Sequence, residues 1–70
     1  MKNVYIDFNC EWYKEDFYFD ENASYVSSIK RLVVGKVKEV RYKDKYINIV
    51  FGKNGLINVN IDDIEKMDIN

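Results

Sequence analysis

Hydrophobic and polar residues alternate strictly along the first part of the chain. The apolar positions of residues 3–12 are Val4, Ile6, Phe8, Cys10 and Trp12. The side chains on the other face are Tyr5, Asp7, Asn9, Glu11 and Tyr13. A period of two predicts a β-strand with one buried face. After a polar break at residues 14–16, residues 17–19 resume a strand, so we expect an N-terminal β-hairpin.

The next segment has the spacing of a helix. Residues 20–22 supply N-cap side chains, and Gly35 is placed to end the helix. Its apolar positions recur at intervals of three or four residues and are Ala23, Val26, Ile29 and Val33. This spacing predicts one short helix over residues 22–33. Serine and β-branched residues in the same segment are poor helix formers, so an extended segment is the alternative.

From Lys36 onward the pattern predicts a three-stranded antiparallel meander. The apolar positions of its last two strands are Ile47, Ile49 and Phe51, then Ile57, Val59 and Ile61. A three-residue loop at residues 53–55 would pair Phe51 with Ile57 and bring the two apolar faces together. That loop requires Gly55 in the left-handed conformation.

The first turn of the meander requires a different loop length. A two-residue loop at Asp44 and Lys45 sets Tyr42 opposite Ile47, and it leaves Val37 out of phase, which predicts a β-bulge near residues 38–39. Residues 62–64 are typical of a capped helical turn, and residues 67–69 of a short closing strand.

These elements define one small β-rich α+β domain over residues 1–70. Its order is an N-terminal β-hairpin, one short helix, a three-stranded antiparallel meander and a short C-terminal strand. In this order of bulge, hairpins, helical turn and closing strand, residues 33–69 resemble the second half of an SH3-like or Sm-like small barrel. Such a barrel is the alternative architecture.

Composition argues against catalysis. The 70 residues include no His and a single Cys, so an imidazole base and an internal disulfide are both excluded. Cys10 is in phase with the apolar face, which predicts a small buried side chain. We expect no enzyme activity, no metal and no cofactor. No apolar run is long enough for a membrane span, so we expect a soluble cytoplasmic protein without a membrane partner.

Charge is unevenly distributed along the chain. Residues 30–55 carry eight basic and two acidic side chains, for a net charge of +6. The flanking segments are acidic, with −4 over residues 1–29 and −3 over residues 56–70. Opposite blocks neutralise each other in many small domains, but a block of one sign also suits a partner of the opposite sign.

Two surfaces are candidate binding sites. The first is acidic and aromatic, suits a protein with a basic surface, and consists of Tyr5, Asp7, Glu11, Tyr13 and Tyr18. The second is basic, suits nucleic acid or a nucleotide, and consists of Arg41, Lys43, Lys45 and Tyr46. Lysines along strand edges also prevent sheet aggregation, which is the simpler explanation of the second set.

The sequence therefore favours a binding protein. We expect a small protein-binding modulator or inhibitor that acts through the first surface. Its size, its lack of catalytic groups and its many Lys, Asn and Ile residues, which AT-rich codons encode, are typical of a phage accessory protein that blocks a host defence system, as anti-CRISPR proteins do. The alternative is a nucleic-acid- or nucleotide-binding domain that uses the basic central hairpin.

Overall fold

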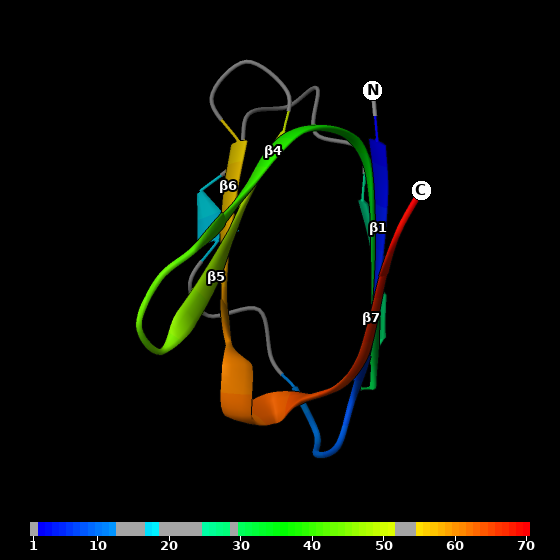
Figure 1. The fold of residues 1–70 in the computed structure, drawn as a ribbon. Helices are drawn as coiled ribbons and strands as arrows, with labels where there is room; N and C mark the ends of the chain where they lie inside the picture. Colours follow the sequence, from blue (N-terminus) through cyan, green and yellow to red (C-terminus); the bar gives the residue numbers. More distant parts are fainter. Residues whose placement is uncertain (1, 13–16, 19–24, 29, 52–54) are drawn as a thin grey trace.

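The computed structural model describes residues 2–12, 17–18, 25–28, 30–51 and 55–70, and β-strands dominate it. The strands are β1 (Lys2–Phe8), β2 (Phe17–Tyr18), β3 (Tyr25–Ser28), β4 (Arg31–Tyr42), β5 (Tyr46–Phe51), β6 (Gly55–Asn60) and β7 (Ile64–Ile69). One turn of 3-10 helix, η1 (Ile61–Asp63), connects β6 to β7. The sheet is antiparallel and open, with the order β2–β6–β5–β4–β1–β7 and with β3 paired to β4 (Figure 1). The prediction of a β-rich domain is confirmed.

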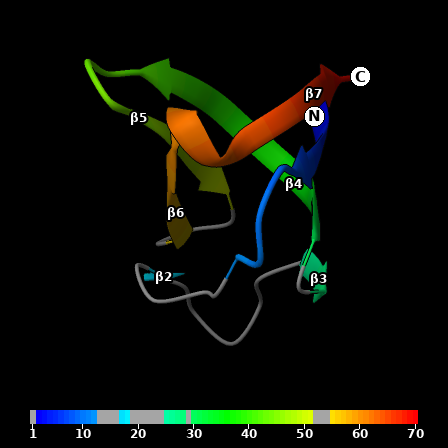
Figure 2. The same cartoon turned by 90° about the horizontal axis from the view of Figure 1, so that it is seen from below.

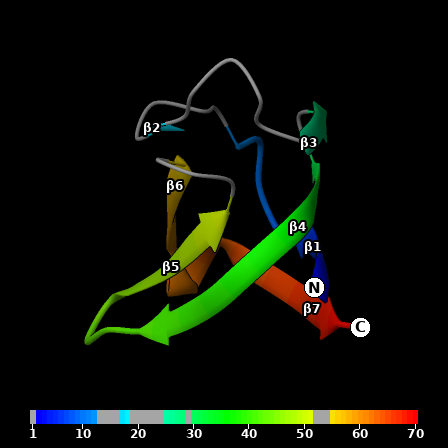
Figure 3. The same ribbon diagram turned by 90° about the horizontal axis from the view of Figure 1, so that it is seen from above.

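The long strand β4 lies in the middle of the sheet and belongs to both of its halves (Figure 3). Its residues 31–34 pair with β3 on one edge and with β1 on the other, whereas residues 37–42 pair with β5. We call β3, β1, β7 and the first part of β4 the β1 half-sheet. The β5 half-sheet consists of β2, β6, β5 and the second part of β4. The two half-sheets face each other across the interior of the molecule (Figures 1 and 2).

Two irregularities of the backbone bend β4. Leu32, Val34 and Val37 are buried and Val40 is partly buried, so the inward positions twice lie three residues apart instead of two. In the first of these gaps Lys36 has a left-handed φ of 57°. In the second, the register with β5 shifts at a β-bulge. Each irregularity adds one residue, so the strand curves while the same face stays on the core. The predicted bulge near residues 38–39 is confirmed.

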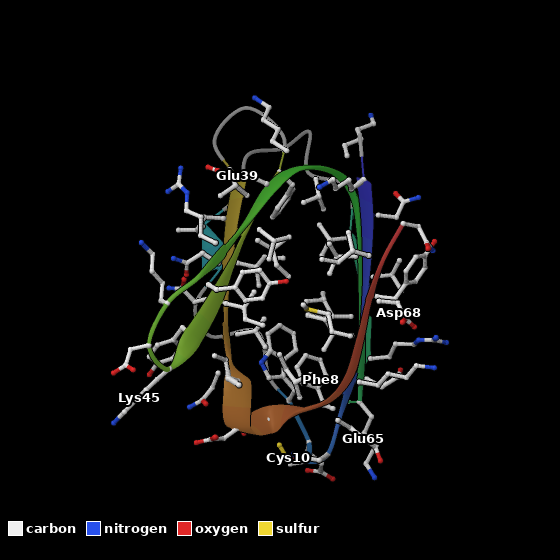
Figure 4. All side chains as sticks on the ribbon, viewed as in Figure 1. Phe8, Cys10, Glu39, Lys45, Glu65 and Asp68 are labelled. Atoms are coloured by element: carbon white, nitrogen blue, oxygen red, sulfur yellow. The ribbon has the colours of Figure 1, made fainter. Side chains whose placement is uncertain are left out.

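The core fills the space between the two half-sheets. Its buried side chains are Val4, Ile6, Phe8, Trp12, Leu32, Val34, Val37, Ile47, Ile49, Phe51, Ile57 and Val59. The rings of Phe8 and Trp12 stack with their centroids 4.7 Å apart, and Phe8 points into the interior (Figure 4). The alternation predicted for the start of the chain is therefore confirmed at Val4, Ile6, Phe8 and Trp12. Burial of such apolar surface is the main force that stabilises a domain of this size.

The predicted helix over residues 22–33 is wrong. Residues 25–28 form β3, residue 31 begins β4, and the two strands pair from Tyr25–Val34 to Ser28–Arg31. Leu32 and Val34 are buried two residues apart, which is the period of a strand. Residues 23, 26, 29 and 33 have helical spacing, but strand pairing outweighs it. β4 supplies backbone partners for both β1 and β3. Gly35 lies inside β4 and ends no helix.

The predicted N-terminal hairpin is also wrong. β1 pairs with β4 and β7, and β2 pairs with β6 in the other half-sheet. Because both edges of β1 are occupied, the segment that follows it has no edge there to join. β1 ends at Phe8, and the next residue, Asn9, is held by η1: its backbone N–H donates to the Asp63 carbonyl at 3.0 Å and its side-chain Nδ2 to the Asp62 carbonyl at 2.8 Å.

The β5–β6 pairing differs from the prediction by two residues. Phe51 pairs with Gly55, and Ile49 pairs with Ile57, so the apolar faces still coincide as expected. Gly55 lies in β6 itself and does not adopt the predicted left-handed conformation. A Cβ atom here would clash with the Phe51 carbonyl oxygen and would come within 2.8 Å of Phe51 Cε2 and 2.9 Å of Cδ2. Glycine is therefore needed because the backbone and ring of Phe51 occupy the space of a side chain. Loop residues 52–54 lie outside the described residues.

The predictions for the β4–β5 turn and for the capped turn before β7 are confirmed. Tyr42 pairs with Ile47, and the Lys43 N–H donates to the Tyr46 carbonyl at 2.8 Å, as a two-residue turn requires. In the turn η1, the Asn60 Oδ1 accepts the Asp62 N–H at 2.9 Å, which is the N-cap contact that stabilises such a turn. The closing strand is longer than predicted and covers residues 64–69.

The left-handed residue in β4 generates a test of stability. Lys36→Gly should raise the free energy of unfolding by about 0.5–1 kcal/mol, because glycine adopts this conformation without the steric cost of a Cβ atom. Urea denaturation followed by the fluorescence of the buried Trp12 measures the change. Lys38→Gly, at an exposed site of ordinary φ, is the matched control and should lower stability. Equal losses in both variants would contradict this account of the bend.

Candidate functional site

The first predicted surface lies on the outer side of β1. Tyr5 and Asp7 are both half-buried and point away from the core, between the buried residues of the same strand. Glu11 is exposed beyond the end of the strand. Tyr13 and the side chain of Tyr18 lie outside the described residues. The structure therefore brings Tyr5 and Asp7 together on one face and leaves the rest of this set untested.

Basic neighbours offset the acidic groups of this surface. In the strand register, Asp7 lies between Arg31 and Lys66. Arg31 Nε is 3.1 Å from Asp7 Oδ1, and Lys66 Nζ is 3.7 Å from Asp68 Oδ2. We define the β1 face as the outward side chains Tyr5, Asp7, Arg31, Val33, Lys66 and Asp68. Its charges are mixed and largely paired, so its described part has a weaker acidic character than the sequence led us to expect.

The second predicted surface lies on the outer side of the β5 half-sheet and is hollowed. A shallow, open hollow of about 370 Å³ is lined by Lys43, Tyr46, Asn48 and Asn58. The tight turn sets Lys43 beside Tyr46, and the β5–β6 register sets Asn48 directly opposite Asn58. The hollow therefore combines an aromatic ring that is 44% exposed, one ammonium group and two amides.

Further cations surround this hollow. Arg41 pairs with Asn48 across the strands, and its Nε donates to Glu39 Oε1 at 2.7 Å. Lys45 is at the tip of the β4–β5 hairpin, where its carbonyl accepts the Ile61 N–H at 3.0 Å (Figure 4). Residues 36–51 carry five basic and two acidic side chains, a net charge of +3. The hairpin is thus positively charged although the whole chain carries −1.

The structure groups the second set of candidate residues well. Lys43 and Tyr46 line the hollow, and Arg41 and Lys45 lie beside it on the same hairpin. Asn48 and Asn58 were absent from the predicted site residues. Their alternation with Ile47, Ile49, Ile57 and Val59 indicates that they point outward. Their pairing with each other depends on the β5–β6 register, and the predicted register differs from the observed one by two residues.

Cys10 is placed differently from its prediction. It is half-buried rather than buried, because β1 ends at Phe8 and the alternation stops there. Partial burial raises the pKa of the Cys10 thiol, and the neighbouring Asp63 carboxylate raises it further. A thiol with a raised pKa is protonated at neutral pH and is a poor nucleophile. Its surroundings therefore do not favour nucleophilic chemistry.

The described residues form neither a metal-binding cluster nor a membrane-spanning helix. No group of three or more His, Cys, Asp or Glu side chains within residues 2–12, 17–18, 25–28, 30–51 and 55–70 is arranged to hold a metal ion. In the same part of the chain, no helix has the length and hydrophobicity that crossing a membrane requires.

Comparisons with known proteins give no further guidance. The chain has no significant match among protein-family models, curated proteins or solved structures. Function must therefore be argued from the geometry of its surfaces.

The surroundings of Cys10 generate a test of reactivity. The rate at which iodoacetamide alkylates Cys10, measured against pH, should give a thiol pKa above the ordinary value. The reason is that partial burial and Asp63 both disfavour the thiolate. Asp63→Asn removes the nearby charge and should lower that pKa, which speeds alkylation at pH 8 by up to about tenfold for each pKa unit recovered. Asp62→Asn is the control. Equal rates in the wild type and both variants would show that Asp63 does not act on the thiol.

Proposed function

We propose that the protein is a non-enzymatic binding domain whose β5 half-sheet holds single-stranded nucleic acid. The observation that carries this proposal is the hollow lined by Lys43, Tyr46, Asn48 and Asn58. A volume of about 370 Å³ lies within the usual range of small-ligand sites and accommodates one base.

The lining residues suit a base that is not paired with another strand. Tyr46 offers a ring face for stacking, which binds any base and favours single strands over duplexes. The amides of Asn48 and Asn58 each carry a donor and an acceptor, so together they complement the polar edge of a stacked base. A duplex presents its bases edge-on and would leave the Tyr46 ring without a stacking partner.

The cations around the hollow supply the contacts to phosphate. Lys43 lines the hollow, and Lys45 and Arg41 extend the positive surface along the hairpin. Three such contacts to a single strand give a slope of log K against log salt of about −2. The negative charge of the chain as a whole opposes binding elsewhere on the surface, so the strand is directed to the hairpin.

Stacking generates the main test of this proposal. Tyr46→Ala should weaken the binding of fluorescently labelled oligouridine and oligothymidine by about tenfold or more, because it removes the ring on which a base stacks. Fluorescence anisotropy, repeated over a salt series, measures the affinity and its salt slope.

A second tyrosine of the same hairpin provides the matched control. Tyr42 is 64% exposed, but it pairs with the buried Ile47 and so lies on the core side of the sheet, away from the hollow. Tyr42→Ala should therefore leave the affinity unchanged. Equal effects of the two substitutions, or the absence of any salt-dependent binding by the wild type, would refute the nucleic-acid proposal.

The second candidate is a protein-binding modulator that acts through the β1 face. The observation that favours it is the half-exposed Tyr5, which the register sets between Val33 and Asp68 near the middle of this face. Tyrosine at the centre of a flat surface often dominates a protein interface. In this role the protein would act in the cytoplasm, as a phage protein that blocks a host defence system does. The paired charges of the β1 face would select a partner whose surface carries both positive and negative charges.

This second candidate is tested with the same set of variants. Immobilised protein should capture a specific partner from a nuclease-treated lysate of a low-GC bacterium. Tyr5→Ala should weaken that capture by about tenfold or more, because it removes the aromatic anchor, whereas Tyr46→Ala should leave it intact. Capture that tolerates Tyr5→Ala, or that both substitutions abolish alike, would exclude the β1 face as the interface. Circular dichroism confirms that each variant is folded.

A further inference from the structure

The strand β7 has a free edge whose backbone groups point to solvent. Asn3 and Asn70 exchange two backbone hydrogen bonds, of 2.8 and 2.9 Å. Hydrogen-bonded and non-hydrogen-bonded pairs alternate along an antiparallel ladder, so Asp68 and Lys66 also direct their backbone groups toward β1. Met67 and Ile69 therefore direct their N–H and C=O groups to the opposite edge. Among the described residues, no strand pairs with that edge.

The outward side chains of β7 are complementary to themselves. Lys66 and Asp68 lie two residues apart on the same face and are well exposed, and Asp68 projects to the outside of the sheet (Figure 4). In a two-fold antiparallel pairing centred on Met67, Lys66 of each copy lies opposite Asp68 of the other. That pair is non-hydrogen-bonded in the backbone, so its side chains approach most closely. The Lys66–Asp68 ion pair of 3.7 Å within each copy is then exchanged for two ion pairs across the axis.

We propose that the protein forms a two-fold symmetric dimer in which β7 pairs antiparallel with β7 of a second copy, with Met67 on the symmetry axis. The backbone groups at Met67 and Ile69, which pair with no described strand of the same copy, are then hydrogen-bonded across the axis. Ile69, which is 39% exposed in one copy, is partly covered by the neighbouring strand. The two sheets become one continuous sheet, and an edge open to aggregation is closed.

The neighbouring self-pairings of β7 are disfavoured by charge. A register centred on Lys66 sets lysine opposite lysine, and one centred on Asp68 sets aspartate opposite aspartate. The register centred on Met67 instead sets opposite charges against each other in both pairs. The other end of the sheet, β2, has two residues in its strand and offers a much shorter ladder.

The arrangement of the fold leaves β7 accessible. β7 lies on the opposite side of the molecule from β5, in views from below and from above (Figures 2 and 3). The proposed dimer therefore does not cover the hollow on the β5 half-sheet, and the inference does not depend on nucleic-acid binding. A contact between two six-residue edges is small, so we expect a dimer that dissociates on dilution.

A charge exchange tests the dimer without nucleic acid. Sedimentation equilibrium of the full chain over a range of concentrations should show a reversible monomer–dimer equilibrium. Asp68→Lys sets lysine opposite lysine in both symmetry-related pairs and should weaken the dimer by about tenfold or more. The double variant Lys66→Asp with Asp68→Lys restores opposite charges and should recover dimerisation.

Two further measurements make the result specific. Asp44→Lys changes the net charge equally at the distant β4–β5 turn, so its dimer should be as strong as that of the wild type. In hydrogen exchange, the Met67 and Ile69 amides should gain protection as the protein concentration rises. The Lys66 and Asp68 amides are already bonded to β1 and should change little.

The proposal is overturned by any of three results. These are a wild-type protein that stays monomeric at millimolar concentration, a dimer that Asp68→Lys does not weaken, and a double variant that fails to recover although its urea denaturation curve shows a folded protein. Because no nucleic acid is present, none of these results bears on the function proposed for the hollow.

Discussion

The fold depends on one strand that serves two half-sheets. β4 pairs with β1 and β3 through its first residues and with β5 through its last, so it must bend by a large angle without turning its apolar face away from the core. The left-handed φ at Lys36 and the bulge near Glu39 each insert one residue to achieve this. Without these two corrections, Val37 and Val40 would not both follow Val34 into the interior, and the half-sheets would have no common core.

Much of the fold could be predicted from the sequence because its constraints are local. Strict alternation determined which side chains of β1 are buried, and the pairing of Tyr42 with Ile47 followed from matching two apolar faces across a short turn. The partners of strands distant in the chain could not be predicted in this way. In residues 22–33 a helical and a strand-like spacing coexist, and the strand at Leu32 prevails because β1 requires a neighbour to bond its backbone.

The candidate site shows the same division between local and distant constraints. The outward direction of Tyr46 follows from the parity of β5 and agrees with its place in the second predicted surface. Which residues lie opposite Tyr46 and Asn48 on β6 depends on the β5–β6 register. The predicted loop gave a register that differs from the observed one by two residues. In that register Asn48 would oppose Asn60, and Tyr46 would oppose Asp62. In the structure Phe51 pairs with Gly55, so Asn58 enters the hollow and a neutral amide instead of a carboxylate lies opposite Tyr46.

The two proposed contacts lie on different half-sheets, yet each could affect the affinity of the other. The hollow lies on the β5 half-sheet, and the free edge of β7 is on the other side of the molecule (Figure 3). A dimer through β7 carries two hollows on one continuous sheet, at opposite ends. If both proposals hold, a single strand long enough to occupy both hollows would bind the dimer more tightly than the monomer, because its second contact would be intramolecular. By thermodynamic linkage the same strand would favour dimerisation, so two weak contacts would support one another without any change of shape in the domain.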